Sequence, residues 1–179
     1  MITGRNGDQL TGIDAATNRP GPVIKLPVGC SDLANLAPDT GTVWVLCPAA
    51  SRVVKIDVAH RTIQGTLTLT AINGFSTPTD LWVGSDRGLV RVDAKTLQPV
   101  ALFEGVSTGL DGDVAVDGDR VWVRTRDGFL YRIDAGSNTV AEQIKPVGEP
   151  GGGSLLVATG SIWTTADDVS YLLRLRAEG

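Results

Sequence analysis

A repeat of about forty residues runs through the whole chain. Tryptophan marks this repeat, and successive copies lie 38, 40 and 41 residues apart, at Trp44, Trp82, Trp122 and Trp163. A second marker, a hydrophobic residue followed by aspartate, keeps the same period at Ile13-Asp14, Ile56-Asp57, Val92-Asp93 and Ile133-Asp134. Repeats of 40 to 45 residues built of strands and turns are typical of propeller blades with four strands each. The sequence therefore predicts an all-β fold, a β-propeller of four-stranded antiparallel blades.

Residues 120–140 are the clearest copy of the repeat. Hydrophobic residues alternate with other residues at Val121, Val123, Tyr131 and Ile133, as in half-buried strands. Turn-forming residues separate these runs at 126–128 and 135–138. The copy predicts strands A to D in the third complete blade, near residues 111–116, 120–125, 129–134 and 139–145. No stretch shows the sustained apolar spacing of a helix.

The number of repeats predicts a single module, residues 1–179, with about four blade equivalents. Residues 1–29 supply strands C and D of a partial blade, and residues 149–179 supply strands A, B and C of another. Complete blades are expected between them, at 30–70, 71–105 and 106–148. Three arrangements remain open: a compact four-bladed ring, a fragment of a longer propeller, or a half-propeller that closes against a second copy. Unpaired edges and bare apolar faces favour the homodimer.

Composition narrows the classes of partner and cofactor. The net charge of −4 and the absence of a basic run argue against nucleic acid as a partner. No apolar run is long enough to cross a bilayer, so membrane insertion is not expected. One histidine and two cysteines cannot build a His-rich or four-thiolate metal site, so we expect no metal and no cofactor.

The repeat motifs are similar to a known family. Val-Trp-Val, then Val-x-Lys/Arg-Ile-Asp, then Thr-Val-x-x-x-Ile-x-Pro-Val-Gly resembles the bacterial YVTN-type propeller repeat, which also occurs in virginiamycin B lyase-like and quinoprotein β-chain-like propellers. The resemblance covers essentially the whole chain and implies the fold. The lyases it includes use a histidine base and metal-holding Glu and His side chains. The single histidine, His60, falls in a C–D turn, so this chemistry carries over to no position.

We therefore expect a non-catalytic binding or scaffolding module for a protein or a small polar ligand. The alternative is a fragment of a lyase-like propeller enzyme whose active residues are missing or supplied by a partner. A cluster of His, Glu and Asp on inward-facing A strands would favour the enzyme, but these strands offer only Asp and Asn.

Loops that emerge on one face of a propeller are the expected place for binding. The candidate ligand-binding residues of the B–C loops are Asp86, Arg87, Arg126, Asp127, Asp167 and Asp168. The D–A loops add Ser107, Thr108, Asp111 and Glu149. Mixed Arg and Asp side chains suit a polar ligand or a polar protein surface, and they equally suit plain solvated turns.

Cys30 and Cys47 are interpreted as a disulfide. If strands A and B of the first complete blade pair through a turn near residues 38–41, the two cysteines lie within one step of direct pairing. Similar pairs in relatives of the resembled family support a bridge, and two buried thiols are the alternative. A bridge would favour an extracytoplasmic location.

Three further features have structural interpretations. The four tryptophans are expected to pack between adjacent blades rather than to stack on a ligand. His60 is expected to be exposed in its turn. The aspartates of residues 111–119 are interpreted as turn and strand-end residues rather than a calcium loop, because Asp117-Gly118 is a hairpin signal.

Overall fold

The computed structural model describes residues 2–3, 8–30, 35–39, 41–145, 151–166 and 172–176. These residues form antiparallel strands, one short 3-10 helix and no α-helix, which confirms the all-β prediction. No helix in these ranges is both long and apolar enough to span a membrane. The chain divides into two compact units, Met1–Ala71 and Ile72–Gly179, and each is described by itself.

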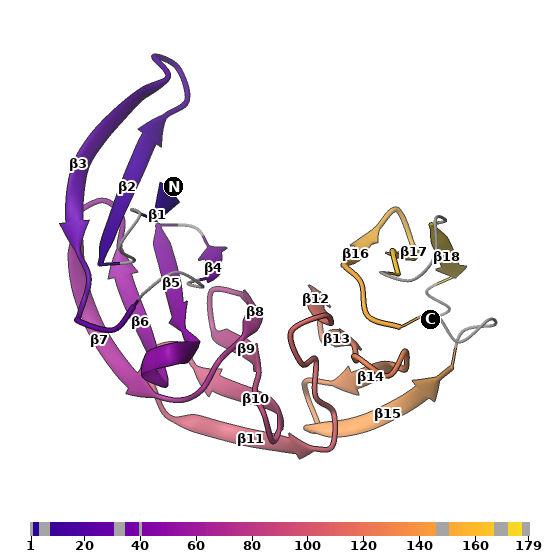
Figure 1. Ribbon diagram of the computed structural model, residues 1–179. Coiled ribbons are helices and arrows are strands. Elements are labelled where there is room, and N and C mark those ends of the chain that lie inside the picture. The colour runs from indigo at the N-terminus through magenta and orange to yellow at the C-terminus, as the bar shows by residue number, and fades with distance from the viewer. Residues whose placement is uncertain are drawn as a thin grey trace. The chain divides into compact units, whose positions relative to one another are not determined.

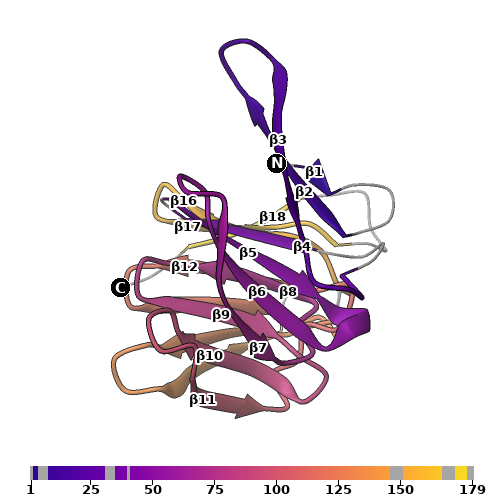
Figure 2. The ribbon, with the colours of Figure 1, turned by 90° about the vertical axis from the view of Figure 1, so that its left-hand side faces the viewer.

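The first unit contains two sheets (Figure 1). The first sheet is formed by β1 (Ile2–Thr3), β2 (Gln9–Asp14) and β3 (Arg19–Lys25). The sequence predicted only the last two of these strands, because a two-residue strand is too short to show alternation. The second sheet follows the chain in the order β4 (Asn35–Asp39), β5 (Thr42–Cys47), β6 (Arg52–Asp57) and β7 (Thr62–Thr68) (Figure 2). The 3-10 helix η1 (Pro48–Ala50) links β5 to β6.

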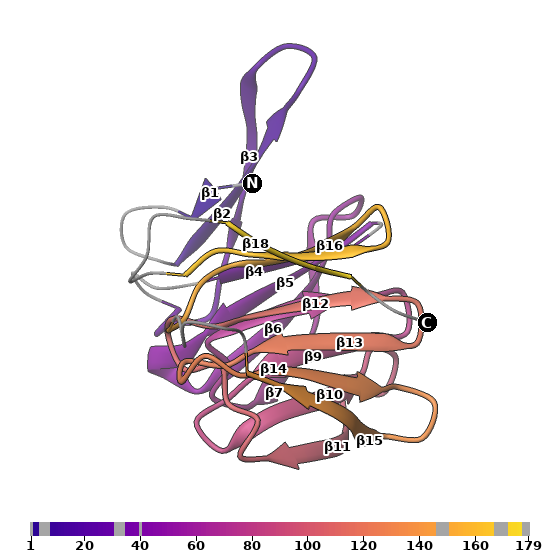
Figure 3. The same ribbon diagram turned by 90° about the vertical axis from the view of Figure 1, so that its right-hand side faces the viewer.

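The second unit contains three sheets, each with its strands in chain order. The third sheet comprises β8 (Asn73–Ser76), β9 (Asp80–Gly84), β10 (Gly88–Asp93) and β11 (Pro99–Glu104). The fourth comprises β12 (Asp113–Asp117), β13 (Arg120–Arg124), β14 (Leu130–Asp134) and β15 (Thr139–Ile144) (Figure 3). The fifth comprises β16 (Leu155–Ala158), β17 (Ser161–Thr164) and β18 (Leu173–Arg176). The first strand of the fourth sheet, β12, contacts both β8 and β16.

The tryptophans of the second unit pack between successive sheets, as predicted. Trp82 belongs to the third sheet and lies in one core cluster with Val121 and Ile133 of the fourth. Trp122 belongs to the fourth sheet and clusters with Ile162 of the fifth. Both indole rings are almost completely buried. The third and fourth sheets therefore each bury a tryptophan at the junction with the sheet that follows.

A cation lies directly across from each tryptophan in the neighbouring strand. The partners in register are Trp44 with Lys55, Trp82 with Arg91, Trp122 with Arg132 and Trp163 with Arg174. In three of the pairs the charged group lies over the ring, at 5.4, 5.0 and 5.3 Å from its centroid. Such contacts add to the burial of the indole. They explain the Lys or Arg in the Val-x-Lys/Arg-Ile-Asp motif.

Arg91 also ties the third sheet to the fourth. Its guanidinium binds both oxygens of Asp80, at 2.7 and 3.0 Å. It also donates to the carbonyl of Ala135 at 2.6 Å and to Asn138 Oδ1 at 2.7 Å. The Asp80 hydrogen bond raises the pKa of Arg91, so the charge persists. These contacts make the ion pair a structural clamp between the two sheets.

The aspartate of the second repeat marker shapes the turn that follows it. In each copy a side-chain oxygen accepts the backbone N–H three residues later, at 2.7 to 2.9 Å. These N–H groups hold the pKa of each carboxyl below its ordinary value; the aspartates are Asp14, Asp57, Asp93 and Asp134. The next residue adopts a left-handed conformation in all four turns, at Asn18, Arg61, Leu97 and Asn138. The marker is therefore a turn signal rather than a site.

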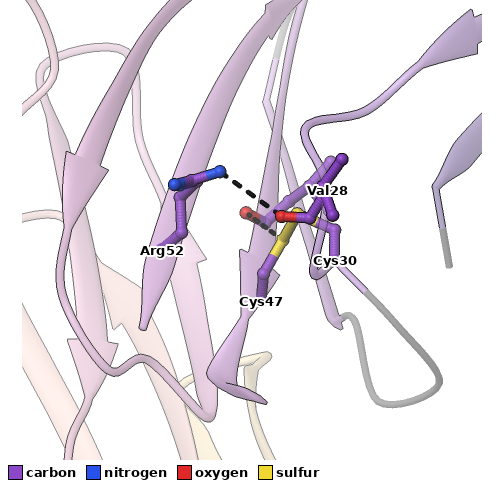
Figure 4. Close-up of a disulfide and its surroundings, with 5 residues drawn as sticks. Val28, Cys30, Cys47 and Arg52 are labelled. Carbon is purple, nitrogen blue, oxygen red and sulfur yellow. Dashed lines mark hydrogen bonds between the residues drawn. A yellow bond between two sulfur atoms is a disulfide. The ribbon is translucent and has the colours of Figure 1, made fainter. Parts of the chain in front are cut away.

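The disulfide between Cys30 and Cys47 is present, and both cysteines are buried (Figure 4). The predicted register was wrong by two residues, because Asn35 pairs with Leu46. Cys30 lies in the connection before β4, and it reaches Cys47 at the end of β5 from there. Arg52 donates to the carbonyl of Val28 beside the bridge, at 3.5 Å.

We predict that removing the bridge weakens the first unit. A Cys30→Ser, Cys47→Ser variant should lose about 2 to 4 kcal/mol of unfolding free energy, because the crosslink no longer restricts the unfolded chain. Urea unfolding followed by circular dichroism measures this loss, and wild-type protein in strong reductant should behave like the variant. An unchanged midpoint in both samples would show that the bridge does not stabilise the fold.

Candidate functional site

Three of the predicted loop residues, Ser107, Arg126 and Asp127, line a hollow in the second unit. Arg126 and Asp127 lie in the β13–β14 loop, and they border a hollow of about 480 Å³ together with Gly105, Ser107 and Gly109 of the β11–β12 connection. Loops that are adjacent in space but distant in sequence thus meet here, as the B–C and D–A geometry predicted.

Arg126 is the most prominent charged group of this hollow. Its Nε lies 3.3 Å from Asp111 Oδ2, and its side chain is 76% exposed. Its aliphatic stem lies against Gly109, where a Cβ would be 3.3 Å from the arginine Cβ and Cδ. The stem is therefore packed while the guanidinium faces solvent. An exposed guanidinium offers several donors in one plane, which suits carboxylate or other polar acceptors.

Asp127 supplies the opposite charge at the same rim. One of its oxygens accepts a hydrogen bond from Thr125 Oγ1 at 2.6 Å, which fixes the carboxylate on the loop. The side chain of Asp127 is exposed. Arg126 and Asp127 therefore present a cation and an anion side by side.

Asp86 and Arg87, the predicted residues of the β9–β10 loop, do not line this hollow. Arg87 pairs with Glu104 at 3.0 Å across β10 and β11, and both side chains are well exposed. Asp86 is exposed in the same loop. Asp167, Asp168 and Glu149 lie outside the described residues, so the predictions for them stand as predictions.

Arg124 supports the β13–β14 loop from below, and the sequence reasoning missed it. Its side chain is completely buried, its Nε donates to the carbonyl of Gly152 at 2.9 Å, and its Nη1 donates to the carbonyl of Gly128. The bond to Gly128 connects the two ends of the β13–β14 loop. The bond to Gly152 joins this loop to the segment before β16. The sequence did contain a signal for Arg124, because it is a charged residue two residues after tryptophan. The other copies have uncharged residues at this position: Leu46, Gly84 and Thr165.

Asn73 and Thr108 fix the other wall of the hollow. Thr108 Oγ1 donates to Asn73 Oδ1 at 2.9 Å, and Asn73 Nδ2 donates to the carbonyl of Gly112. Gly84 makes room for this contact, because a Cβ there would lie 2.0 Å from Thr108 Oγ1. The β11–β12 connection is therefore held against the third sheet by polar contacts that leave no space for a side chain.

Asp113 occupies the position of the fourth sheet that Asn73 occupies in the third, nine residues before tryptophan. Its Oδ2 accepts the backbone N–H of Leu155 in the fifth sheet at 3.0 Å, and its Oδ1 accepts the N–H of Val114 at 2.8 Å. Burial raises the pKa of this carboxyl, although both hydrogen bonds act in the other direction. The inner strands β8 and β12 thus each use a polar side chain to join the neighbouring sheet.

His60 lies exposed in the β6–β7 turn, as predicted. Its Nδ1 lies 2.8 Å from Asp57 Oδ2, and the hydrogen bond with this carboxylate raises the pKa of the imidazole. The ring takes the place that Thr17, Thr96 and Ser137 occupy in the other turns. Across the described part of the chain, no group of His, Cys, Asp and Glu side chains is arranged to hold a metal ion.

We predict that Asp113 makes stability depend on pH. Its pKa is higher in the native state than in the unfolded chain, so its contribution to stability falls as pH rises through the native pKa. Asp113→Asn removes this titration and keeps the size of the side chain. The Tm of the variant relative to wild type should therefore increase as pH rises above the ordinary aspartate pKa of about 3.9, and it should level off once the native carboxyl is ionised. Differential scanning calorimetry tests this, and a difference that stays constant or decreases with pH would contradict it.

Comparison with known proteins identifies the fold. No protein-family model and no curated protein matches the chain. BamB from Moraxella catarrhalis matches with a TM-score of 0.71 and 10% identity over 89% of this chain. Hydrazine synthase from Kuenenia stuttgartiensis matches with a TM-score of 0.67 and 14% identity. The computationally designed Ika4 protein matches with a TM-score of 0.66 and 13% identity, and each of these two matches covers 80% of this chain.

The chain spans 50% of the BamB chain, 45% of the hydrazine synthase chain and 89% of the Ika4 chain. It thus covers about half the length of both natural proteins. Identities of this order show a shared fold and nothing about activity. The five antiparallel sheets and these structural neighbours together show that the chain has the β-propeller fold.

Proposed function

We propose that this β-propeller module is a non-catalytic binding unit, and that it takes a polar ligand or a polar protein surface at the hollow beside Arg126. The observation that carries the proposal is the exposed Arg126 guanidinium, held above a hollow of about 480 Å³ by packing against Gly109. A long side chain ordered in this way loses less freedom when a ligand binds than a side chain free in solvent.

The support beneath the hollow favours binding as well. Arg124 anchors the β13–β14 loop, and the contact between Asn73 and Thr108 anchors the β11–β12 connection. Loops fixed on a rigid sheet framework are a common arrangement for recognition. Arg126, Asp127 and Asp111 together favour a ligand that carries both acceptors and donors over a simple anion.

The catalytic alternative lacks a comparable arrangement in the described residues. His60 is hydrogen-bonded to Asp57 in the β6–β7 turn. The inner-strand side chains of Asn73 and Asp113 form hydrogen bonds to neighbouring sheets. A general base needs a position within reach of a substrate in a cleft. The side chains of His60, Asn73 and Asp113 are engaged in structural bonds, whereas Arg126 remains at the surface.

We further propose that the repeats are of the YVTN type. The recurring order of tryptophan, cation and aspartate supports this, because each of the three has a defined structural role in the sheets. The disulfide supports a location in an oxidising, extracytoplasmic compartment, where such bridges persist.

The binding proposal predicts where a ligand acts. Titration of ¹⁵N-labelled protein with a short peptide of glutamate and serine should shift amide signals of residues 105–112 and 125–128. Arg126→Ala should weaken the binding about tenfold, because a hydrogen bond to a charged group is lost. Arg87→Ala is the matched control, since this exposed arginine lies in the corresponding loop of the third sheet, and it should bind the peptide like wild type.

Two results would contradict this proposal. One is a set of shifts that avoids both segments. The other is equal affinity of the wild type and the Arg126→Ala variant.

A further inference from the structure

The fifth sheet has an apolar face on the side opposite to the fourth sheet. Its strands turn Leu155 and Ile162 toward Trp122 of the fourth sheet. Because side chains alternate along a strand, Leu156 and Trp163 lie on the other face, where they are paired across β16 and β17. Leu156, Trp163 and Leu172 line a hollow of about 410 Å³ on this face.

This face is less covered than its counterparts in the same unit. Trp82 and Trp122 are 1% and 2% exposed, because each is covered by the following sheet. Trp163 occupies the same repeat position and is only partly buried. Leu156 and Leu172 are 59% and 56% exposed, which is unusual for leucines that share one face. We call Leu156, Trp163 and Leu172 the donor face.

The first sheet carries an isoleucine that is uncovered, although its equivalents in the second and fourth sheets are buried against a preceding sheet. Ile13, Ile56 and Ile133 are equivalent, since each precedes the aspartate of the second repeat marker. Ile133 is 0% exposed and clusters with Trp82 of the preceding sheet, and Ile56 is 0% exposed and clusters with Leu10 of the first sheet. Ile13 is 39% exposed. We call the side of the first sheet that carries Ile13 the acceptor face.

We propose that the donor face of one chain binds the acceptor face of a second copy, and that two such contacts join a two-fold dimer. The contact repeats the interface between tryptophan and the following sheet that the second unit already contains twice. The occupant is a second copy because this chain carries both halves of that interface, each uncovered. In a two-fold dimer both contacts form together, so neither face is left bare.

The interface resembles the inter-sheet junctions in composition. The donor side supplies an indole with Arg174 stacked on it at 5.3 Å, as Arg91 stacks on Trp82. An aromatic residue in an apolar surround is typical of the residues that dominate binding energy at protein interfaces. Trp163 is therefore the expected anchor of the contact.

Light scattering coupled to size exclusion tests the proposal on the full chain. Wild type should elute as a dimer of about twice 18.7 kDa. A Leu156→Asp, Leu172→Asp variant and an Ile13→Asp variant should each elute at 18.7 kDa, because a charge in either face loses both contacts. Val140→Asp is the matched control, since Val140 is an exposed apolar residue on β15 outside both faces, and this variant should remain a dimer.

Mixing the two disrupted variants makes the test specific. A mixed pair keeps one intact donor face against one intact acceptor face, so a heterodimer should form although neither variant dimerises alone. Its formation also shows that both variants are folded.

Four results would overturn the proposal. The first is a wild type that is monomeric throughout the micromolar range, which would leave the donor face to a different partner or to another part of the chain. The second is a series of open-ended oligomers. The third is a dimer that survives the charges in both faces. The fourth is a pair of variants that are folded by circular dichroism but do not complement each other.

Discussion

The packing of a tryptophan from one sheet against the next sheet is the interaction on which the second unit depends. Trp82 and Trp122 each bury a large ring where two twisted sheets meet, and each ring also carries a cation from the adjacent strand or lies in register with one. Ring burial contributes most of the energy, since an indole removes a large apolar area from water. Stacked sheets that contact only their neighbours derive stability from these junctions.

The same principle explains how polar groups are distributed. Side chains at the start of the inner strands, such as Asn73 and Asp113, join neighbouring sheets through backbone groups. Asp80 and Arg91 do the same near the opposite ends of the strands. These groups are needed for structure. This distribution underlies our proposal that recognition takes place at the loops, where the Arg126 guanidinium is exposed.

Sequence reasoning predicted the features that repeat. The tryptophan period gave the order of the strands in each four-stranded sheet, and the aspartate marker located the turns, because these residues recur at the same places in the repeat. Features that occur once were harder to predict. Arg124 was missed because its partners are carbonyls of distant loops, and the cysteine register was wrong because Cys30 lies outside the strand that was used to count. The sequence predicted only that the loop face would carry a binding site. The hollow beside Arg126 could not be predicted, since its shape depends on contacts between the β11–β12 and β13–β14 loops.

A double-mutant cycle between Trp82 and Val121 tests the central claim most directly, because the two residues belong to different sheets and share one core cluster. The unfolding free energies of wild type, Trp82→Ala, Val121→Ala and the double variant give the coupling between them. Packing across the junction predicts a coupling energy of about 0.5 to 3 kcal/mol. Effects that add with no coupling would show that the tryptophan stabilises its own sheet alone, and would contradict the account.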